Sequence, residues 1–387
     1  FQQQVAKLVF YGGVFLHGFF LSCGTGGGQN MAAKAMAQQL QRRGHTVTQM
    51  DPYQLVSQRT ADRVGALYSS LVQRSPRGFG VLYSLGEAYR KLPVRSPVYW
   101  ANGRLASAME RYLHEHRFDC IVMTHMYAAH ILAHVQGPLP PTLLIATDYT
   151  CIPFMEESRC DWYGVPSPDL VEEFVSRGIP KEKIWPAGIP VREEFGRQET
   201  REEACARLGL PPQNRYLLLA GGEIGAGQIT QSLEALRSYV QERPACRVLV
   251  ICGKNRRLYD QLVKEWGKPP HMQWMGCTED MAGYMRASDV FITKPGGLSS
   301  TEAAVLGIPL VHITPIPGCE QHNGTYFSSR GMSVLVQDPQ RELLLALQAL
   351  GPAERVRMVA AQKRYVPGSA AEDLCRLLEE SCQKAAL

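Results

Sequence analysis

Short apolar runs recur along the chain, and segments with helical periodicity separate most of them. The runs lie at residues 14–22, 46–50, 120–124, 143–147, 163–165, 216–220, 248–252, 290–293 and 310–314. Several are apolar on both faces, which is typical of parallel strands covered by helices on each side. A helix is expected at 30–43, where Gly44 ends it. The pattern predicts an α/β architecture with mostly parallel sheets.

The segment 186–195, PAGIPVREEF, marks a boundary between two halves of the chain. It holds two prolines and a glycine, and a polar, acidic helix follows it. At 387 residues the chain is long enough for two or three cores. We expect a Rossmann-like domain at 1–190, a second at 195–355, and C-terminal helices at 356–387 that pack back on the first. The two sheets would face a central cleft.

Composition excludes several classes of protein. A chain that is 45% hydrophobic and 20% charged is not disordered. The net charge of +5 is too small to indicate nucleic acid, and no nucleic-acid-binding motif accompanies it. The 11 cysteines include no CxxC pair, so reduced thiols are expected, without a disulfide framework or a structural metal site. No uninterrupted apolar run is long enough for a membrane-spanning helix.

The apolar run 8–22 behind Lys7 has two interpretations. It has the character of a signal-peptide core with Cys23 after it, which would indicate a secreted or lipid-anchored protein. It also fits a buried first strand. His17 and three glycines interrupt the run, and cleavage near Cys23 would remove the strand that the next motif needs. These features favour the strand.

Three glycine-rich loops follow predicted strands, at 24–28, 221–227 and 252–255. Glycine lets a backbone approach a ligand closely, and a helix N-terminus offers free N–H groups to an anion. In parallel sheets, ligands bind beyond the carboxyl ends of the strands. One such loop also fits an ordinary tight turn. Three of them in two domains predict a ligand in the cleft, with a pyrophosphate at the second-domain loops.

A further motif, TKPGGLSSTEAAVLGIPLVH, occupies residues 293–312. A strand ends at Thr293, a sharp turn follows, and Gly307 ends the short helix after it. Glu302 in that helix can accept the hydroxyls of a ribose, or it can simply favour the helix dipole. The next run, 317–323, concentrates hydrogen-bonding side chains that suit sugar hydroxyls or an ordinary polar loop.

These motifs together resemble a known family. GTGGGQN at 24–30, ATDY at 146–149, GGEIGAG at 221–227 and the stretch 293–323 resemble the diacylglycerol glycosyltransferases. That family includes plant monogalactosyldiacylglycerol synthases and bacterial processive glucosyltransferases, and it is related to the peptidoglycan N-acetylglucosaminyltransferase. The resemblance spans residues 21–333. It implies a GT-B fold, a UDP-hexose donor, inverting transfer to diacylglycerol, and peripheral attachment to the cytoplasmic face of the cell membrane.

The resemblance also implies roles for individual residues. Glu302 would hold the ribose, and the stretch 274–281, with Met275, would face the uracil through backbone groups. The diphosphate would be lined by Gly222, Gly225, Gly296, Gly297, Ser299, Ser300 and Thr301. The sugar hydroxyls would contact Glu320, Gln321 and Asn323. On the acceptor side stand Gly26, Gly27 and Gly28.

One position departs from the family. The family has a histidine directly after GGG, where it is the leading candidate for the general base, and this chain has Gln29. A glutamine amide does not take a proton near neutral pH. Either another residue is the base, with His125 and Asp148 as candidates after predicted strands, or the enzyme is weakened, or the protein binds substrates without turnover. Both candidates also fit structural roles, His125 in packing and Asp148 as a cap.

The segment 71–104 holds six lysines and arginines and one acid, Glu87. Aromatic residues interleave with the cations. A surface of this kind suits an anionic bilayer, although an ordinary pair of surface helices has the same composition. The residues expected to meet the membrane and admit diacylglycerol are Arg90, Lys91, Arg95, Tyr99 and Trp100.

No DxD-type acidic pair is present, so no cofactor and no obligatory metal ion is expected. Backbone N–H groups and helix N-termini would stabilise the departing diphosphate instead. Competing hypotheses are a non-catalytic UDP-sugar or lipid sensor, transfer of N-acetylglucosamine to a polyprenyl-linked acceptor, and a sugar-nucleotide epimerase. The sequence leaves open whether the hexose is glucose or galactose.

Overall fold

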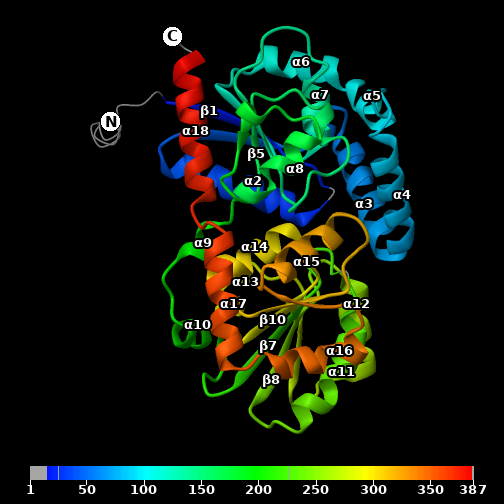
Figure 1. The fold of residues 1–387 in the computed structure, drawn as a ribbon, viewed down its shortest axis with the longest axis vertical. Helices are drawn as coiled ribbons and strands as arrows, with labels where there is room; N and C mark the ends of the chain where they lie inside the picture. The colour runs from blue at the N-terminus through cyan, green and yellow to red at the C-terminus, as the bar shows by residue number, and fades with distance from the viewer. Residues whose placement is uncertain (1–14, 25, 226, 386–387) are drawn as a thin grey trace.

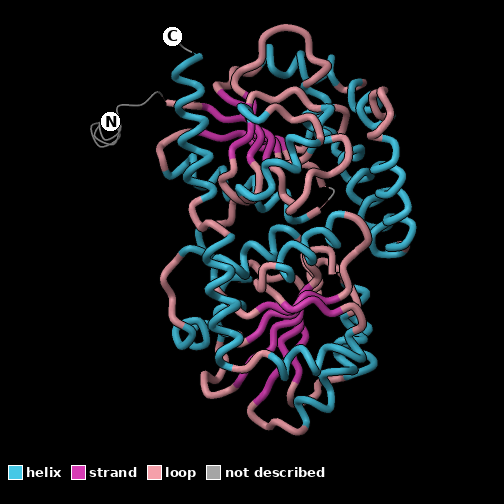
Figure 2. Tube along the Cα trace, in the orientation of Figure 1, coloured by secondary structure: helices cyan, strands magenta, loops and turns pink. Residues whose placement is uncertain are grey.

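The computed structural model describes residues 15–24, 26–225 and 227–385. Residues 8–14 of the apolar run 8–22, which include the start of the first predicted strand, lie outside the described residues, as do positions 25 and 226 of the glycine-rich loops. Figure 1 shows two α/β bodies stacked along the long axis of the molecule. Figure 2 shows that each body has its own sheet with helices around it.

The first sheet has six parallel strands in the order β2-β1-β3-β4-β5-β6. They are β1 (His17–Leu21), β2 (Thr46–Met50), β3 (Cys120–Met123), β4 (Thr142–Ile145), β5 (Trp162–Gly164) and β6 (Ile184–Trp185). The helices of this part are α2 (Gly27–Arg42), α3 (Gln58–Arg74), α4 (Pro76–Tyr89), α5 (Pro97–Gly103), α6 (Ala106–Glu115), α7 (Met126–Leu132) and α8 (Val171–Ser176).

The second sheet is also parallel, in the order β12-β11-β10-β7-β8-β9. Its strands are β7 (Arg215–Ala220), β8 (Cys246–Ile251), β9 (Met272–Met275), β10 (Val290–Thr293), β11 (Leu310–Ile313) and β12 (Val334–Val336). The helices are α9 (Glu193–Gly196), α10 (Arg201–Leu208), α11 (Ile229–Gln241), α12 (Arg256–Trp266), α13 (Met281–Ala287), α14 (Gly297–Leu306), α15 (Cys319–Ser329), α16 (Pro339–Ala349) and α17 (Pro352–Tyr365).

Burial explains why the strands form where they do. Every residue of β3, β4, β10 and β11 is buried, as expected for central parallel strands with helices on both faces. This confirms the predicted α/β architecture with parallel sheets. Three strands were not predicted, namely β6, β9 and β12, and all three lie at sheet edges. The first helix also begins at Gly27 rather than at residue 30, so two loop glycines belong to its first turn.

The C-terminal segment divides between the two domains. Helix α17 packs on the second domain, where Gln362 donates from Nε2 to the carbonyl oxygens of Ile308 and Met332, each at 3.0 Å. This corrects the expectation that all of 356–387 lies on the first domain. Helix α18 (Ala370–Ala385) crosses to the first domain and lies beside α2 (Figure 1). Its apolar face joins α2 and the first sheet in one buried cluster.

An ion-pair network fixes α18 in place. Arg43 donates from Nε and Nη2 to the two carboxylate oxygens of Glu379, at 2.7 and 2.6 Å. The Nε2 atom of His45 lies 2.8 Å from the same carboxylate. These partly buried contacts hold the pKa of Glu379 below its usual range, against the opposing effect of burial.

Within the described residues, no helix is both long and apolar enough to cross a bilayer.

Candidate functional site

A cleft of about 700 Å³ lies between the two domains. Its first-domain wall comes from residues that follow β1 and β4 and from helices α3 and α4. Its second-domain wall comes from the segments after β7, β8, β9, β10 and β11. The carboxyl ends of both parallel sheets therefore open into one space, which is where such sheets bind ligands.

Two glycine-rich loops, which follow β7 and β8, form part of the second-domain wall of the cleft. Gly222 lines the cleft with φ of 70°, a conformation that favours glycine. Gly225 supports the loop from behind and does not line the cleft: a Cβ there would lie 2.1 Å from the carbonyl oxygen of Cys252. The two loops are thus packed backbone against backbone, and a side chain at Gly225 would separate them.

Helix α14 points its N-terminus into the cleft. Gly296, Gly297 and Ser299 line the space, as the diphosphate role requires. Ser300 and Thr301 do not, which corrects their predicted role. Both are fully buried. The hydroxyl of Ser300 lies 2.9 Å from His312 Nε2, and that of Thr301 donates to the carbonyl oxygen of Gly297 at 2.7 Å.

Glu302 lines the cleft and is only 5% exposed. Arg192 approaches it at 3.8 Å while also pairing with Glu194 at 2.7 Å. Burial raises the pKa of Glu302 to about 8, and Arg192 opposes that shift. A carboxyl group in this position can accept hydrogen bonds from ribose hydroxyls. Arg192, which the sequence analysis missed, belongs to the linker between the domains.

The predicted sugar-binding residues separate into three environments. Glu320 lines the cleft, where it pairs with Lys294 and accepts from the Ile316 N–H at 3.1 Å. Gln321 is exposed and accepts from the backbone N–H of Gly318 at 3.3 Å. Asn323 is fully buried and bonded on both ends of its amide to other protein groups. Asn323 and Gln321 therefore do not line the cleft as predicted.

The predicted uracil-facing stretch contributes only in part. Met275 ends β9 and does not line the cleft, which differs from the prediction. Its neighbours Cys277, Thr278, Glu279 and Met281 do line it. Strand β9 is a partly exposed edge strand, and Met275 is its last residue. The loop that follows the strand reaches the cleft instead.

The first-domain loop meets the second domain closely. Gly26, Gly27, Gly28 and Gln29 all line the cleft. A Cβ on Gly27 would lie within 1.8 Å of a carboxylate oxygen of Glu223, and one on Gly28 would lie 3.4 Å from the Leu298 Cβ. Glycine is therefore what allows the two domains to approach here. Gln29 lies in the first turn of α2 and faces the cleft at this junction.

The structure separates the two candidate general bases. Asp148 lines the cleft, and burial raises the pKa of its carboxyl group. His125 is buried at the N-terminus of α7, where its Nδ1 accepts from the Tyr127 N–H at 3.2 Å. Burial lowers the pKa of His125 to about 3. His125 does not line the cleft, so its position fits the structural role.

Helices α3 and α4 close one side of the cleft with apolar side chains. Tyr68, Val72 and Phe79 line it from the first domain and pack with Ile316 of the second. Gly80 of α4 lies against the ring of Pro317. This side of the cleft suits an apolar molecule. Tyr68 and Val72 were not predicted as site residues, because their spacing is that of ordinary helix packing.

The residues expected to meet the membrane divide into exposed and buried side chains. Lys91, Arg95 and Trp100 are exposed. The Arg90 side chain is only 3% exposed, since its guanidinium pairs with Glu156 at 2.6 Å and donates to the Cys151 carbonyl oxygen at 3.0 Å. Tyr99 is buried as well, with its ring tilted against that of His134 and the ring centroids 4.1 Å apart. Arg90 and Tyr99 therefore hold the first domain together.

The outer face of this region is strongly apolar. Seven large hydrophobic side chains on α3, α4, α5 and the turn between α4 and α5 are more than half exposed, which we call the apolar face: Leu67, Val81, Leu82, Leu85, Leu92, Val94 and Trp100. Large apolar side chains exposed close together in sequence suggest an interaction site. Helices α3 and α4, which carry four of the seven, also line the cleft.

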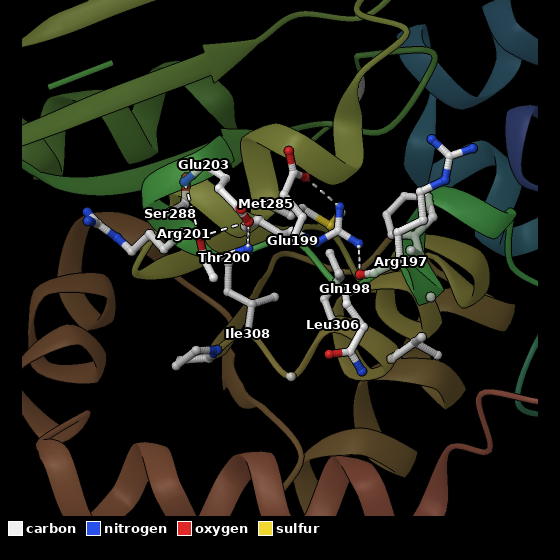
Figure 3. Close-up of a pocket in the computed structure, with 16 residues that line it drawn as sticks. Arg197, Gln198, Glu199, Thr200, Arg201, Glu203, Met285, Ser288, Leu306 and Ile308 are labelled. Atoms are coloured by element: carbon white, nitrogen blue, oxygen red, sulfur yellow. Dashed lines mark hydrogen bonds and ion pairs between the residues drawn. The ribbon is translucent and has the colours of Figure 1, made fainter. Parts of the chain in front are cut away.

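A second cavity, of about 560 Å³, lies in the second domain, where the end of the linker and helices α13 and α14 line it (Figure 3). Arg286 donates to Glu199 at 3.0 Å and to the Arg197 carbonyl oxygen at 2.9 Å. Arg201 likewise donates to the backbone, at the Asn214 carbonyl oxygen. These contacts of Arg286 and Arg201 join the segment after the linker to the rest of the second domain. Over the described ranges, no group of three metal-binding side chains occurs.

Comparisons with known proteins match this geometry. Residues 29–191 match the model of the monogalactosyldiacylglycerol (MGDG) synthase domain, and residues 216–346 match that of the glycosyltransferase family 28 C-terminal domain. The solved structure of MurG from Acinetobacter baumannii aligns with a TM-score of 0.59 at 16% identity, covering 94% of this chain and 99% of that one. The fold is that of the GT-B class, and both matched domain models are those of glycosyltransferases.

Among curated relatives, the processive diacylglycerol beta-glucosyltransferase of Staphylococcus carnosus is 28% identical over 63% of this chain and 63% of its own length. That of Bacillus licheniformis is 25% identical over 85% of each chain. Both domain models are matched in order, so the chain is similar to the diacylglycerol glycosyltransferases through both of its domains.

Proposed function

We propose that this protein transfers a hexose from a UDP-sugar to the hydroxyl group of diacylglycerol at a membrane surface. The observation that carries the proposal is one cleft in which Asp148 of the first domain faces the glycine loops and α14 of the second. The relatives named above suggest glucose as the first donor to test, and the MGDG synthase domain suggests galactose as the second.

The donor would lie along the second-domain wall. Glu302 would accept the ribose hydroxyls, Gly222, Gly296 and Gly297 would flank the diphosphate, and Glu320 would meet the sugar. The first turn of α14 has free backbone N–H groups, which stabilise the negative charge that grows on the departing UDP. The proposal needs no metal ion, and chelation with EDTA should leave the rate unchanged.

The acceptor would enter along the apolar side of the cleft formed by Tyr68, Val72 and Phe79. We propose Asp148 as the general base. Its carboxylate takes the proton of the diacylglycerol hydroxyl while the oxygen bonds to the anomeric carbon and the bond to UDP breaks, which inverts that carbon. A raised carboxyl pKa suits a base that works near neutral pH.

The apolar face would place the enzyme on the cytoplasmic face of the cell membrane. Its apolar side chains suit the acyl boundary, and the exposed Lys91 and Arg95 beside them suit anionic headgroups. Because α4 contributes to this face and to the cleft, a lipid could reach the acceptor side without leaving the membrane.

A non-catalytic UDP-sugar or lipid sensor is the second candidate, and Gln29 in the cleft favours it. The test is UDP release from UDP-glucose and UDP-galactose, with and without anionic vesicles that contain diacylglycerol, for the wild type, Asp148→Asn and Gln29→His. Lipid-dependent release by the wild type that Asp148→Asn abolishes supports the transferase. Donor binding without release in the wild type, and release only with Gln29→His, supports the sensor.

A further inference from the structure

Lys294 follows β10 directly and lines the cleft, with only 11% of its side chain exposed. A nearly buried ammonium group is costly unless an anion faces it. In this structure the anion is Glu320, whose carboxylate pairs with Lys294 Nζ. Glu320 has a second engagement, since its other oxygen accepts from the Ile316 N–H.

The Lys294 ammonium lies between the two loops that flank the diphosphate position. A Cβ built on Gly222 would lie 4.0 Å from Lys294 Nζ, and one built on Gly296 would lie 3.6 Å from it. Glycines at both positions leave open space beside the ammonium. An oxygen atom of a bound phosphate placed between the loops would be within reach of Nζ.

The other cations that line the cleft, among the residues that the structure describes, lie elsewhere. Arg192 stands at Glu302 and Glu194, at the ribose end. Lys254 pairs with Glu223 and is 68% exposed. Lys34 is an exposed residue of α2. Lys294 is therefore the nearly buried cation beside the phosphate loops.

We propose that Lys294 is the cationic clamp for the donor's diphosphate, and that Glu320 holds this ammonium in the empty cleft and is released toward the sugar hydroxyls when the diphosphate takes its place. The inference deepens the proposed function and rests on it. In this exchange the diphosphate displaces the Glu320 carboxylate from Lys294, and the same carboxylate then meets the sugar. Recognition of the phosphate and recognition of the sugar are therefore coupled.

The exchange has a physical basis. A diphosphate offers more charge and more acceptor oxygens than a carboxylate, and charge-assisted hydrogen bonds are strong in a closed site. The first turn of α14 adds its positive potential at the same place. Uridine alone brings no phosphate and should leave the Lys294–Glu320 pair intact.

The experiment is a calorimetric affinity series with uridine, UMP and UDP. We expect Lys294→Met to weaken UDP binding by roughly 30- to 100-fold, as loss of one charge-assisted contact does, and to change uridine binding less than about 3-fold. Lys294→Arg should recover most of the UDP affinity. Lys254→Met, which removes an exposed cation of the same cleft, should change UDP affinity less than about 3-fold.

Because Lys294→Met leaves Glu320 buried without its partner, the pair Glu320→Gln and Lys294→Met/Glu320→Gln provides a second comparison. Glu320→Gln frees Lys294 and should bind UDP at least as tightly as the wild type, whereas the double variant should lose the same 30- to 100-fold. The clamp would be overturned if Lys294→Met lost uridine and UDP affinity equally. It would also be overturned if UDP affinity were unchanged in both Lys294→Met and Lys294→Met/Glu320→Gln. A wild type that binds neither ligand overturns the proposed function itself.

Discussion

Asn323 of the second domain donates a hydrogen bond from Nδ2 to Oδ1 of Asp148 in the first domain, at 2.8 Å. The same amide accepts from the Tyr149 N–H at 2.7 Å and donates to the Pro295 carbonyl oxygen at 3.1 Å. One buried side chain thereby fixes the position of the proposed base against the turn that precedes α14.

Replacing Asp148 with Asn should lower kcat by about 100- to 10,000-fold, because general bases contribute roughly that much. UDP affinity should stay within a few-fold, which calorimetry checks. Burial raises the pKa of Asp148, so the wild-type rate should fall on the acidic side at a pH above the ordinary aspartate range. His125→Asn keeps a side chain able to cap α7 and is the matched control. A large loss of kcat in that control would point to His125 instead.

Gly297→Ala should push the domains apart. The new Cβ would lie 1.9 Å from the Thr147 carbonyl oxygen and 3.2 Å from the Asp148 Cα, and both are backbone atoms. A displacement near 1 Å in an active site costs about 100-fold in kcat. UDP affinity should fall much less than kcat, because the three atoms nearest to the new Cβ all belong to the first domain. Gly351→Ala, where a Cβ meets nothing within 4 Å, should retain wild-type activity in the same assay.

The stability of the wild type should fall between pH 5 and 7 because of Glu302. Burial raises its folded pKa to about 8 from an ordinary value of 4.5. Over that window the unfolded chain loses the proton while the folded chain keeps it, so the free energy of unfolding decreases as pH rises. Glu302→Gln should remove roughly 2–3 kcal/mol of this decrease, at about 1.4 kcal/mol per pH unit. Urea unfolding at pH 5 and at pH 7 measures the free energy of unfolding of the wild type and of Glu302→Gln. An equal change with pH in the two proteins would contradict the prediction.

Leu82→Glu/Leu85→Glu should detach the protein from anionic vesicles. These side chains on the apolar face are 57% and 61% exposed, and burying each in lipid is worth roughly 1.5–3 kcal/mol. Cosedimentation should drop at least tenfold while UDP affinity stays constant. Leu345→Glu/Val356→Glu changes two apolar positions of the second domain that are somewhat more exposed, at 64% and 71%, and serves as the control. Equal binding by both double variants would exclude the apolar face as the docking surface.

Arg90→Met should lower the free energy of unfolding of the first domain rather than weaken lipid binding. Loss of its buried guanidinium leaves Glu156 and the Cys151 carbonyl oxygen without a partner, at a cost of about 3–5 kcal/mol. Lys91→Met, one residue on and exposed, should change the free energy of unfolding by less than about 0.5 kcal/mol. Urea unfolding compares the two, and a cost below 1 kcal/mol for Arg90→Met would contradict this role.

The central strands could be predicted because their burial on both faces leaves a plain apolar run, as in β3 and β10. Edge strands carry no such signal: β6 has two residues, and β9 is half exposed. Their pairing depends on neighbours that are distant in sequence.

The site was predictable where a motif fixes the backbone and less so where side-chain direction decides. Ser299 and Ser300 are adjacent, yet the helix turns one toward the cleft and the other toward His312. Arg90 reads as a surface cation until Glu156, 66 residues away, is brought beside it. Lys294 was overlooked because its partner is 26 residues further along the chain.

The crossing of α18 has a consequence for synthesis. Leu374, Leu377 and Leu378 complete the core over one face of the first sheet, together with Phe20 and Met36. The ribosome makes those leucines after all of the second domain. The first domain therefore keeps an open apolar face until the whole second domain has been synthesised and α18 has followed it, so the half that is made first is completed after the half that is made second.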